Sequence, residues 1–138
     1  MLEVLSVVER GWRGARECSL VLQRHGIKVT HVIKGRLSPD LQRVIVPYPL
    51  IRLIVVPRVL FRPCLWAALI AASVRGRLGW LILDHERTLR EVSGWCRAFG
   101  ITPVLIEERA SDYRLLRDGS AAAVASVFGL PDRRGESA

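Results

Sequence analysis

Apolar residues recur along the first part of the chain with two different periods. Residues 3–8, Glu-Val-Leu-Ser-Val-Val, form a short apolar run that is typical of a buried strand. From Ala15 onward, apolar positions fall three, six and seven residues apart, which places them on one face of a helix that ends at Gly26. Apolar and polar residues then alternate from Ile27 to Ile33, which predicts a second strand. Strand, helix and strand in this short stretch predict a βαβ unit, with parallel strands and a right-handed crossover.

The same order returns later in the chain. Residues 78–83, Leu-Gly-Trp-Leu-Ile-Leu, predict a strand, and a helical stripe of Leu89, Val92, Cys96 and Phe99 follows it. Thr-Leu-Arg-Glu at residues 88–91 fits a capping box that begins this helix. Gly100 ends the helix, and residues 101–106 predict the answering strand. Pro103 inside that strand indicates a sheet edge or a bulge.

The remaining segments complete the expected architecture. Residues 42–49 and 51–57 predict two short strands, residues 65–74 a helix, and residues 112–128 a terminal helix interrupted near Gly119. This order predicts an α/β fold: a three-layer sandwich whose mainly parallel sheet is built from two βαβ units. We expect one domain over residues 1–129 and a disordered polar tail over residues 130–138.

One apolar segment, residues 50–74, is about as long as a membrane span. Three arginines and two prolines interrupt it, and its uninterrupted part, residues 64–74, has 11 residues. Because a span needs about 20 apolar residues, a buried strand followed by a buried helix is the favoured interpretation. The alternative is an interaction or scaffold protein that contacts a partner, or peripherally a membrane surface, through residues 50–66.

Composition and charge narrow the classes of partner. Hydrophobic residues make up 50% of the chain and charged residues 25%, the balance of a folded domain. The net charge is +8, and residues 1–62 hold most of it, with eleven Lys or Arg against four acids. This half is expected to attract an anionic partner. The alternative explanation is a general bias toward arginine, since 19 of the 21 basic residues are Arg.

Other residue patterns argue against nucleic-acid binding, a metal site and a disulfide framework. No recognition helix, zinc finger or aromatic stacking pattern accompanies the basic residues, so nucleic acid is not the expected partner. Cys18, Cys64 and Cys96 are widely spaced among apolar neighbours, which predicts small core residues and no metal site or disulfide framework. The same pattern, without a signal peptide, predicts a cytoplasmic protein.

A parallel sheet places ligands outside the carboxyl ends of its strands. The segments that follow the predicted strands are basic in the first unit and acidic in the second. They contain Arg10, Arg13, Lys34 and Arg36 on the basic side, and Asp84, His85, Glu86, Glu107 and Glu108 on the acidic side. Such a rim suits a nucleotide-like ligand, with phosphates at the basic end and hydroxyls at the acidic end.

The turn Gly11-Trp12-Arg13-Gly14 allows two interpretations. Glycines at a strand-to-helix turn let the backbone approach a phosphate, and the helix start supplies N–H donors. Arg10, Gly11, Arg13 and Gly14, with Lys34 and Arg36, are therefore the ligand-binding candidates. The dinucleotide-binding motif Gly-x-Gly-x-x-Gly is absent, and so is the phosphate-loop motif Gly-x-x-x-x-Gly-Lys-Ser/Thr. An ordinary turn therefore stays open as the alternative.

Asp84 and His85 are the catalytic candidates, because they follow a strand at the position where acid and base groups often stand. A small stand-alone enzyme would use them. The alternative is helix entry, since acidic side chains stabilise the positive end of a helix. The sequence identifies no cofactor and leaves open whether the chain is an enzyme.

Residues 10–35, RGWRGARECSLVLQRHGIKVTHVIKG, resemble the opening βαβ unit in the N-terminal, Rossmann-like domain of GT-B glycosyltransferases, and ATP-grasp enzymes begin similarly. The resemblance implies that Gly11 and Gly14 lie in the acceptor-side loop and that His25-Gly26 forms the turn into the second strand. GT-B enzymes also need a donor-binding domain, for which 138 residues leave no room. The resemblance therefore implies an accessory or N-terminal-type domain that binds an anionic nucleotide, a sugar phosphate or a lipid-linked acceptor and acts with a partner subunit.

Overall fold

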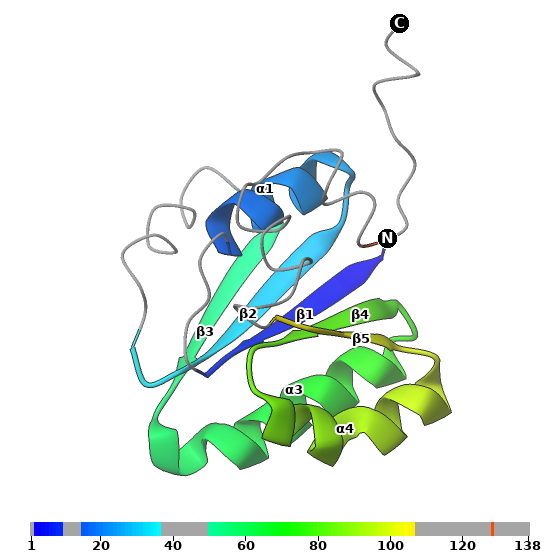
Figure 1. Cartoon of the computed structure of the whole chain (residues 1–138). Coiled ribbons are helices and arrows are strands. Elements are labelled where there is room, and N and C mark those ends of the chain that lie inside the picture. Colours follow the sequence, from blue (N-terminus) through cyan, green and yellow to red (C-terminus); the bar gives the residue numbers. More distant parts are fainter. Residues whose placement is uncertain (1, 10–14, 37–49, 107–127, 129–138) are drawn as a thin grey trace, which may run out of the picture.

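A five-stranded parallel sheet forms the centre of the fold. The computed structural model describes residues 2–9, 15–36, 50–106 and 128. The strands of the described chain are β1 (Glu3–Val8), β2 (Lys28–Lys34), β3 (Ile51–Val56), β4 (Leu78–Leu83) and β5 (Thr102–Leu105). They lie in the order β3-β2-β1-β4-β5, and each neighbouring pair is parallel (Figure 1).

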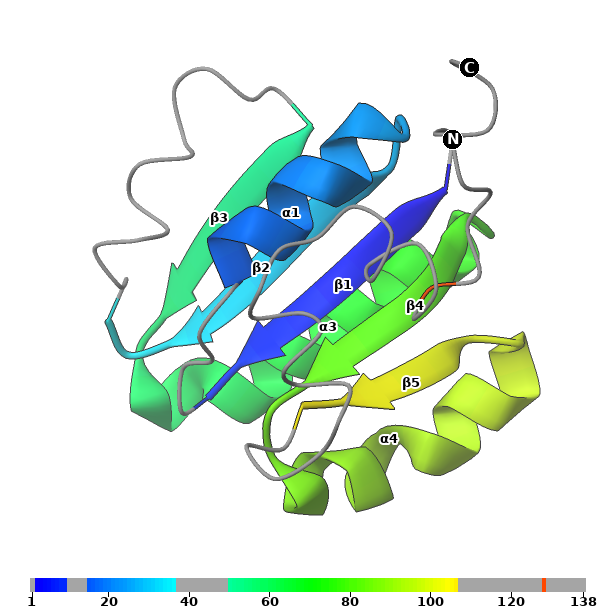
Figure 2. The ribbon, with the colours of Figure 1, turned by 45° about the horizontal axis from the view of Figure 1, so that its top comes forward.

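Helices cover both faces of this sheet. Helix α1 (Ala15–Arg24) lies on one face, and α3 (Phe61–Val74) and α4 (Glu86–Phe99) lie together on the other (Figure 2). A short 3-10 helix, η1 (Arg58–Leu60), joins β3 to α3. The predicted three-layer, Rossmann-like α/β sandwich is thus confirmed, and every strand pair described is parallel.

The neighbouring strands β1 and β4 are nearly continuous apolar runs, because both faces of the sheet are buried. In β1, Val4 and Val8 pack in the core under α1, whereas Leu5 and Val7 pack in the core under α3 and α4. Alternate side chains of one strand therefore serve two separate cores. This two-sided burial holds the central strand in place between the layers.

The end of α1 shows how a single glycine directs the chain into the next strand. Gly26 has a φ of 74°, in the left-handed region where a side chain is strained. Its N–H donates to the Gln23 carbonyl at 2.9 Å, and the Ile27 N–H donates to the Leu22 carbonyl at 3.1 Å. These two bonds form a Schellman motif, which confirms the predicted helix end.

Two helix starts differ from the expected positions. Helix α3 begins at Phe61 rather than at residue 65, because Pro63 stands in the first turn, where no intrahelical N–H partner is required. Helix α4 begins at Glu86, with His85 as its N-cap. The capping box at residues 88–91 is therefore wrong, and Thr88 lies inside the helix.

Strand β5 lies at the sheet edge with Pro103 exposed, as the proline predicts. The strand expected at residues 42–49 and the polar tail at 130–138 lie outside the described residues, as does the helix at 112–128 apart from Phe128. Among the described helices, none has the length and apolar character needed to cross a membrane.

Candidate functional site

The sheet reverses its strand order beside β1. From β1 the chain moves outward through β2 to β3, crosses by α3, and then moves outward on the other side through β4 to β5. We call the end of the sheet at which Val8, Lys34 and Leu83 finish their strands the carboxyl edge. In sheets of this type, ligands bind at the carboxyl edge beside the reversal point, so the connections after β1 and β4 frame the candidate site.

Asp84 joins these two connections. Its carboxylate oxygens Oδ1 and Oδ2 accept from the backbone N–H of Glu9 at 3.0 and 3.1 Å. The hydroxyl of buried Thr88 in turn donates to Oε2 of Glu9 at 2.7 Å. The chain leaving β1 is thus fastened to the start of α4 by bonds between residues far apart in sequence. Asp84 has a positioning role at the reversal point, and its predicted catalytic role stays a prediction.

His85 begins α4. Its backbone is extended, and its ring Nδ1 accepts from the Arg87 N–H at 3.1 Å. A helix start leaves several N–H groups without intrahelical partners, and this bond satisfies one of them. His85 therefore has the helix-entry role that was the alternative to catalysis, and catalysis by His85 stays a prediction.

The basic side of the carboxyl edge follows β2. The Nζ of Lys34 lies 5.3 Å from the centre of the Phe61 ring, a cation–π contact that holds it over the start of α3. Gly35 then turns the chain with a φ of 88°, and exposed Arg36 follows. The side chain of Arg58 is also here, since a Cβ added to Gly35 would lie 3.5 Å from Arg58 Nε.

The strand order therefore separates the charges along the edge. Lys34, Arg36 and Arg58 lie beyond β2 and β3, and Asp84 lies beyond β4, with β1 between them. Arg58 was not predicted at this edge, because it stands in the apolar segment 50–74, whose pattern indicates burial and gives no sign of an anion contact. The remaining candidates, Arg10, Gly11, Arg13 and Gly14, together with Glu107 and Glu108, lie outside the described residues.

A polar group lies buried beneath α1. The Ser19 hydroxyl donates to the Ala15 carbonyl at 2.7 Å and lies 2.6 Å from Nε2 of His31. Because its one proton is used on Ala15, the Nε2–H of His31 must donate to Ser19. Nδ1 of His31 then carries a lone pair, and it is buried without a hydrogen-bond partner in the described chain, as is the hydroxyl of Ser6 on the neighbouring strand. His31 thus has a hydrogen-bonding role inside the core beneath α1.

Neither the cysteines nor the acidic residues form a recognisable metal centre in the ranges described, where no three potential ligands come together. Cys18 and Cys96 are buried, as expected for core residues, whereas Cys64 is half-buried. Burial raises the pKa of the Cys96 thiol, which opposes formation of a nucleophilic thiolate.

The alternative contact surface, residues 50–66, contains exposed apolar side chains. Val59 is 88% exposed and Leu60 51% exposed, and Val55 is also exposed. These side chains lie just before or at the start of an apolar helix, with arginines among them. Contact with a partner or a membrane surface through this segment stays a prediction.

No protein-family model matches this chain, and no curated protein matches it. The resemblance of residues 10–35 to GT-B enzymes therefore stays a prediction.

Proposed function

We propose that this chain is a Rossmann-like binding domain that takes an anionic nucleotide, a sugar phosphate or a lipid-linked acceptor at its carboxyl edge and acts with a partner subunit. One observation carries the proposal, namely the reversal of the parallel sheet between β1 and β4. The connections on either side of such a reversal diverge to opposite faces, and ligands bind in the crevice between them.

The charges at the carboxyl edge support an anionic ligand with hydroxyl groups. Lys34, Arg36 and Arg58 supply the cations on the β2 and β3 side. Arginine binds phosphate through a planar fork of donors, and lysine adds a compact charge. On the other side lies the carboxylate of Asp84, which holds the Glu9 backbone and belongs to the class of groups that accept hydrogen bonds from hydroxyls.

The hydrogen bonds of Asp84 and His85 support a structural role for both side chains, so that a partner subunit would supply the groups that react. Asp84 holds the Glu9 backbone, and His85 Nδ1 holds the start of α4. Proton transfer by either side chain would disturb a bond on which the local structure depends. We therefore assign these groups to positioning and the reacting groups to a second chain, as the resemblance to GT-B enzymes implies.

Thermal unfolding with small anions tests the binding site. The probes are uridine diphosphate, glucose 1-phosphate and inorganic phosphate, each added over a wide concentration range. A ligand at 100 times its Kd stabilises the folded state by about 2.7 kcal/mol, so at least one organic phosphate is expected to raise the melting temperature by several degrees. Arg13→Gln and Lys34→Gln are expected to reduce that rise, because each removes a proposed phosphate contact.

The matched control is Arg97→Gln, since Arg97 is exposed on α4. This variant removes the same charge away from the proposed site and should respond to the probes as the unchanged protein does. An equal rise in all four proteins would remove the proposed site. No rise with any organic phosphate would contradict the ligand class.

A further inference from the structure

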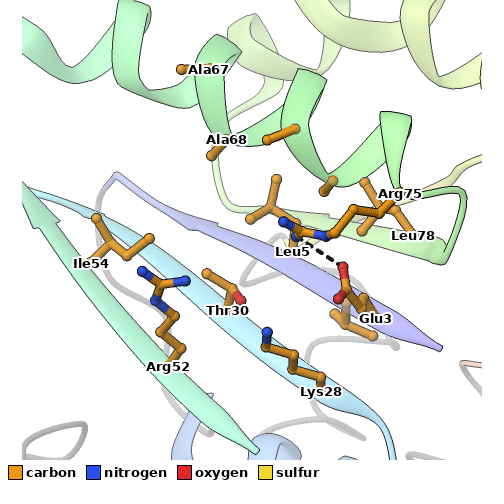
Figure 3. A pocket seen from close by; sticks show the side chains of 13 residues that line it. Glu3, Leu5, Lys28, Thr30, Arg52, Ile54, Ala67, Ala68, Arg75 and Leu78 are labelled. Carbon is orange, nitrogen blue, oxygen red and sulfur yellow. Dashed lines mark hydrogen bonds and ion pairs between the residues drawn. The ribbon is translucent and has the colours of Figure 1, made fainter. Parts of the chain in front are cut away.

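A second concave site lies at the other end of the strands. We call this end, where β1, β2 and β4 begin at Glu3, Lys28 and Leu78, the amino edge. Here a cavity of about 300 Å³ opens between the sheet and α3 (Figure 3). Its volume is at the lower end of the range found for small-molecule sites.

The cavity exists because small side chains face it from the helix. Ala67, Ala68, Ala71 and Ala72 line its upper wall, and they recur at the spacing of one helix face. Such short side chains cannot reach across to the sheet. The space that a larger residue would fill in a close-packed interior therefore stays open over β2 and β3.

Three cations from three different elements line the same cavity. Lys28 begins β2, Arg52 is in β3, and Arg75 follows the end of α3. Figure 3 shows the charged ends of all three directed toward the space between the sheet and α3, with Thr30 between Lys28 and Arg52. Thr30 and Arg52 are register partners of neighbouring strands, which fixes this grouping by backbone pairing.

Only part of this positive charge is neutralised. Arg75 forms an ion pair with Glu3 at 3.1 Å. Lys28 and Arg52 form no ion pair within the described ranges of the chain. Like charges that share a concave surface repel one another and attract an anion, since clefts lined by one sign of charge concentrate counter-ions.

We propose that this cavity binds a small amphipathic anion. Its carboxylate or phosphate head would lie on Arg52 and Lys28, with the Thr30 hydroxyl as a further donor. Its apolar body would lie along Ala67 and Ala68. This site is independent of the proposed carboxyl-edge site, because the two lie at opposite ends of the parallel strands.

The two parts of the ligand follow from two parts of the lining. A fully hydrated inorganic anion would use the cations and leave the alanine wall, Ile54 and Leu78 unused. A neutral apolar molecule would leave two cations without a counter-charge. An ion with both a charged head and an apolar body is the ligand that uses the whole lining, because burial of apolar surface adds to the charge-assisted hydrogen bonds.

Calorimetric titration with octanoate and octyl phosphate tests this inference. Inorganic phosphate and octanol are the matched probes that carry only a head or only an apolar body. At least one octyl anion is expected to bind saturably, and at least tenfold more tightly than either matched probe. The octanoate and octyl phosphate arms separate a carboxylate ligand from a phosphate ligand.

Two variants test the location by different means. Arg52→Gln removes the fork of donors and should weaken binding at least tenfold. Ala71→Leu fills the cavity without changing its charge and should weaken binding of the octyl anions, while circular dichroism confirms that the helix content is kept. Arg97→Gln, away from the cavity, should bind as the unchanged protein does.

The results expected for the amino-edge cavity can be distinguished from those expected for the proposed carboxyl-edge site. Lys34→Gln, at the opposite end of β2, should leave octyl anion binding unchanged, whatever its effect on nucleotide binding. Absence of saturable binding by both octyl anions would overturn the inference. So would unchanged affinity in both Arg52→Gln and Ala71→Leu, or binding of inorganic phosphate as tight as that of octyl phosphate.

Discussion

Lowering the pH from 7.5 to 4 will reduce the free energy of unfolding by about 3 kcal/mol through His31 alone. Burial lowers the pKa of His31 from 6.5 to about 4, because the protonated ring is poorly solvated under α1. In the unfolded chain the ring takes up a proton below pH 6.5. The folded state is therefore fully stable with respect to this group above pH 6.5, and it loses stability as the pH falls toward 4.

Urea unfolding at a series of pH values measures this effect. His31→Gln keeps an N–H that can donate to Ser19 but has no titrating ring, so its unfolding free energy should change less across this pH interval by about 3 kcal/mol. His25→Gln, at a half-buried position at the end of α1, is the matched control for the loss of a histidine side chain, and the His31→Gln protein is compared with it as well as with the unchanged protein. Equal pH dependence in His31→Gln and the unchanged protein would contradict the assignment.

Asp84→Ala will destabilise the protein by about 2 kcal/mol at neutral pH. Hydrogen bonds to a charged group contribute about 1.5–3 kcal/mol, and this substitution leaves the Glu9 N–H without its acceptor at a half-buried position. Asp84→Asn keeps one acceptor oxygen and should lose less than half as much. Chemical denaturation of the three proteins provides the comparison. An Asp84→Ala protein as stable as the unchanged one would contradict the positioning role and favour a catalytic one.

The strands could be predicted because two-sided burial leaves a strong local signal. Continuous apolar runs place β1 and β4 at residues 3–8 and 78–83, the bounds that the structure shows. The start of α4 was harder to predict, because the hydroxyl of Thr88 could form either of two hydrogen bonds. Locally it suits a capping box, but in the fold it donates to Glu9, 79 residues away. A hydrogen bond between residues far apart in the sequence thus replaces the local one, and the spacing of residues along the chain does not indicate it.

The two candidate sites differ in how far they could be predicted from the sequence alone. The carboxyl edge follows from parallel strands, so the positions of Lys34 and Asp84 could be expected without coordinates. The amino-edge cavity depends on the register that sets Thr30 beside Arg52, and on alanines that give no chemical signal. One signal was available in the sequence, since Lys28 and Thr30 are polar at alternate positions at the start of β2, on the same face of the strand.

The proposed function requires that an organic phosphate bind at the carboxyl edge, beside the reversal of the sheet. The most direct measurement is a titration of the ¹⁵N-labelled protein with uridine diphosphate or glucose 1-phosphate, followed by backbone amide chemical shifts. We predict saturable shifts at Glu9, Gly35 and Asp84, with Lys28 and Arg52 at the amino edge unchanged. Shifts confined to the amino edge, or none with either ligand, would contradict the claim.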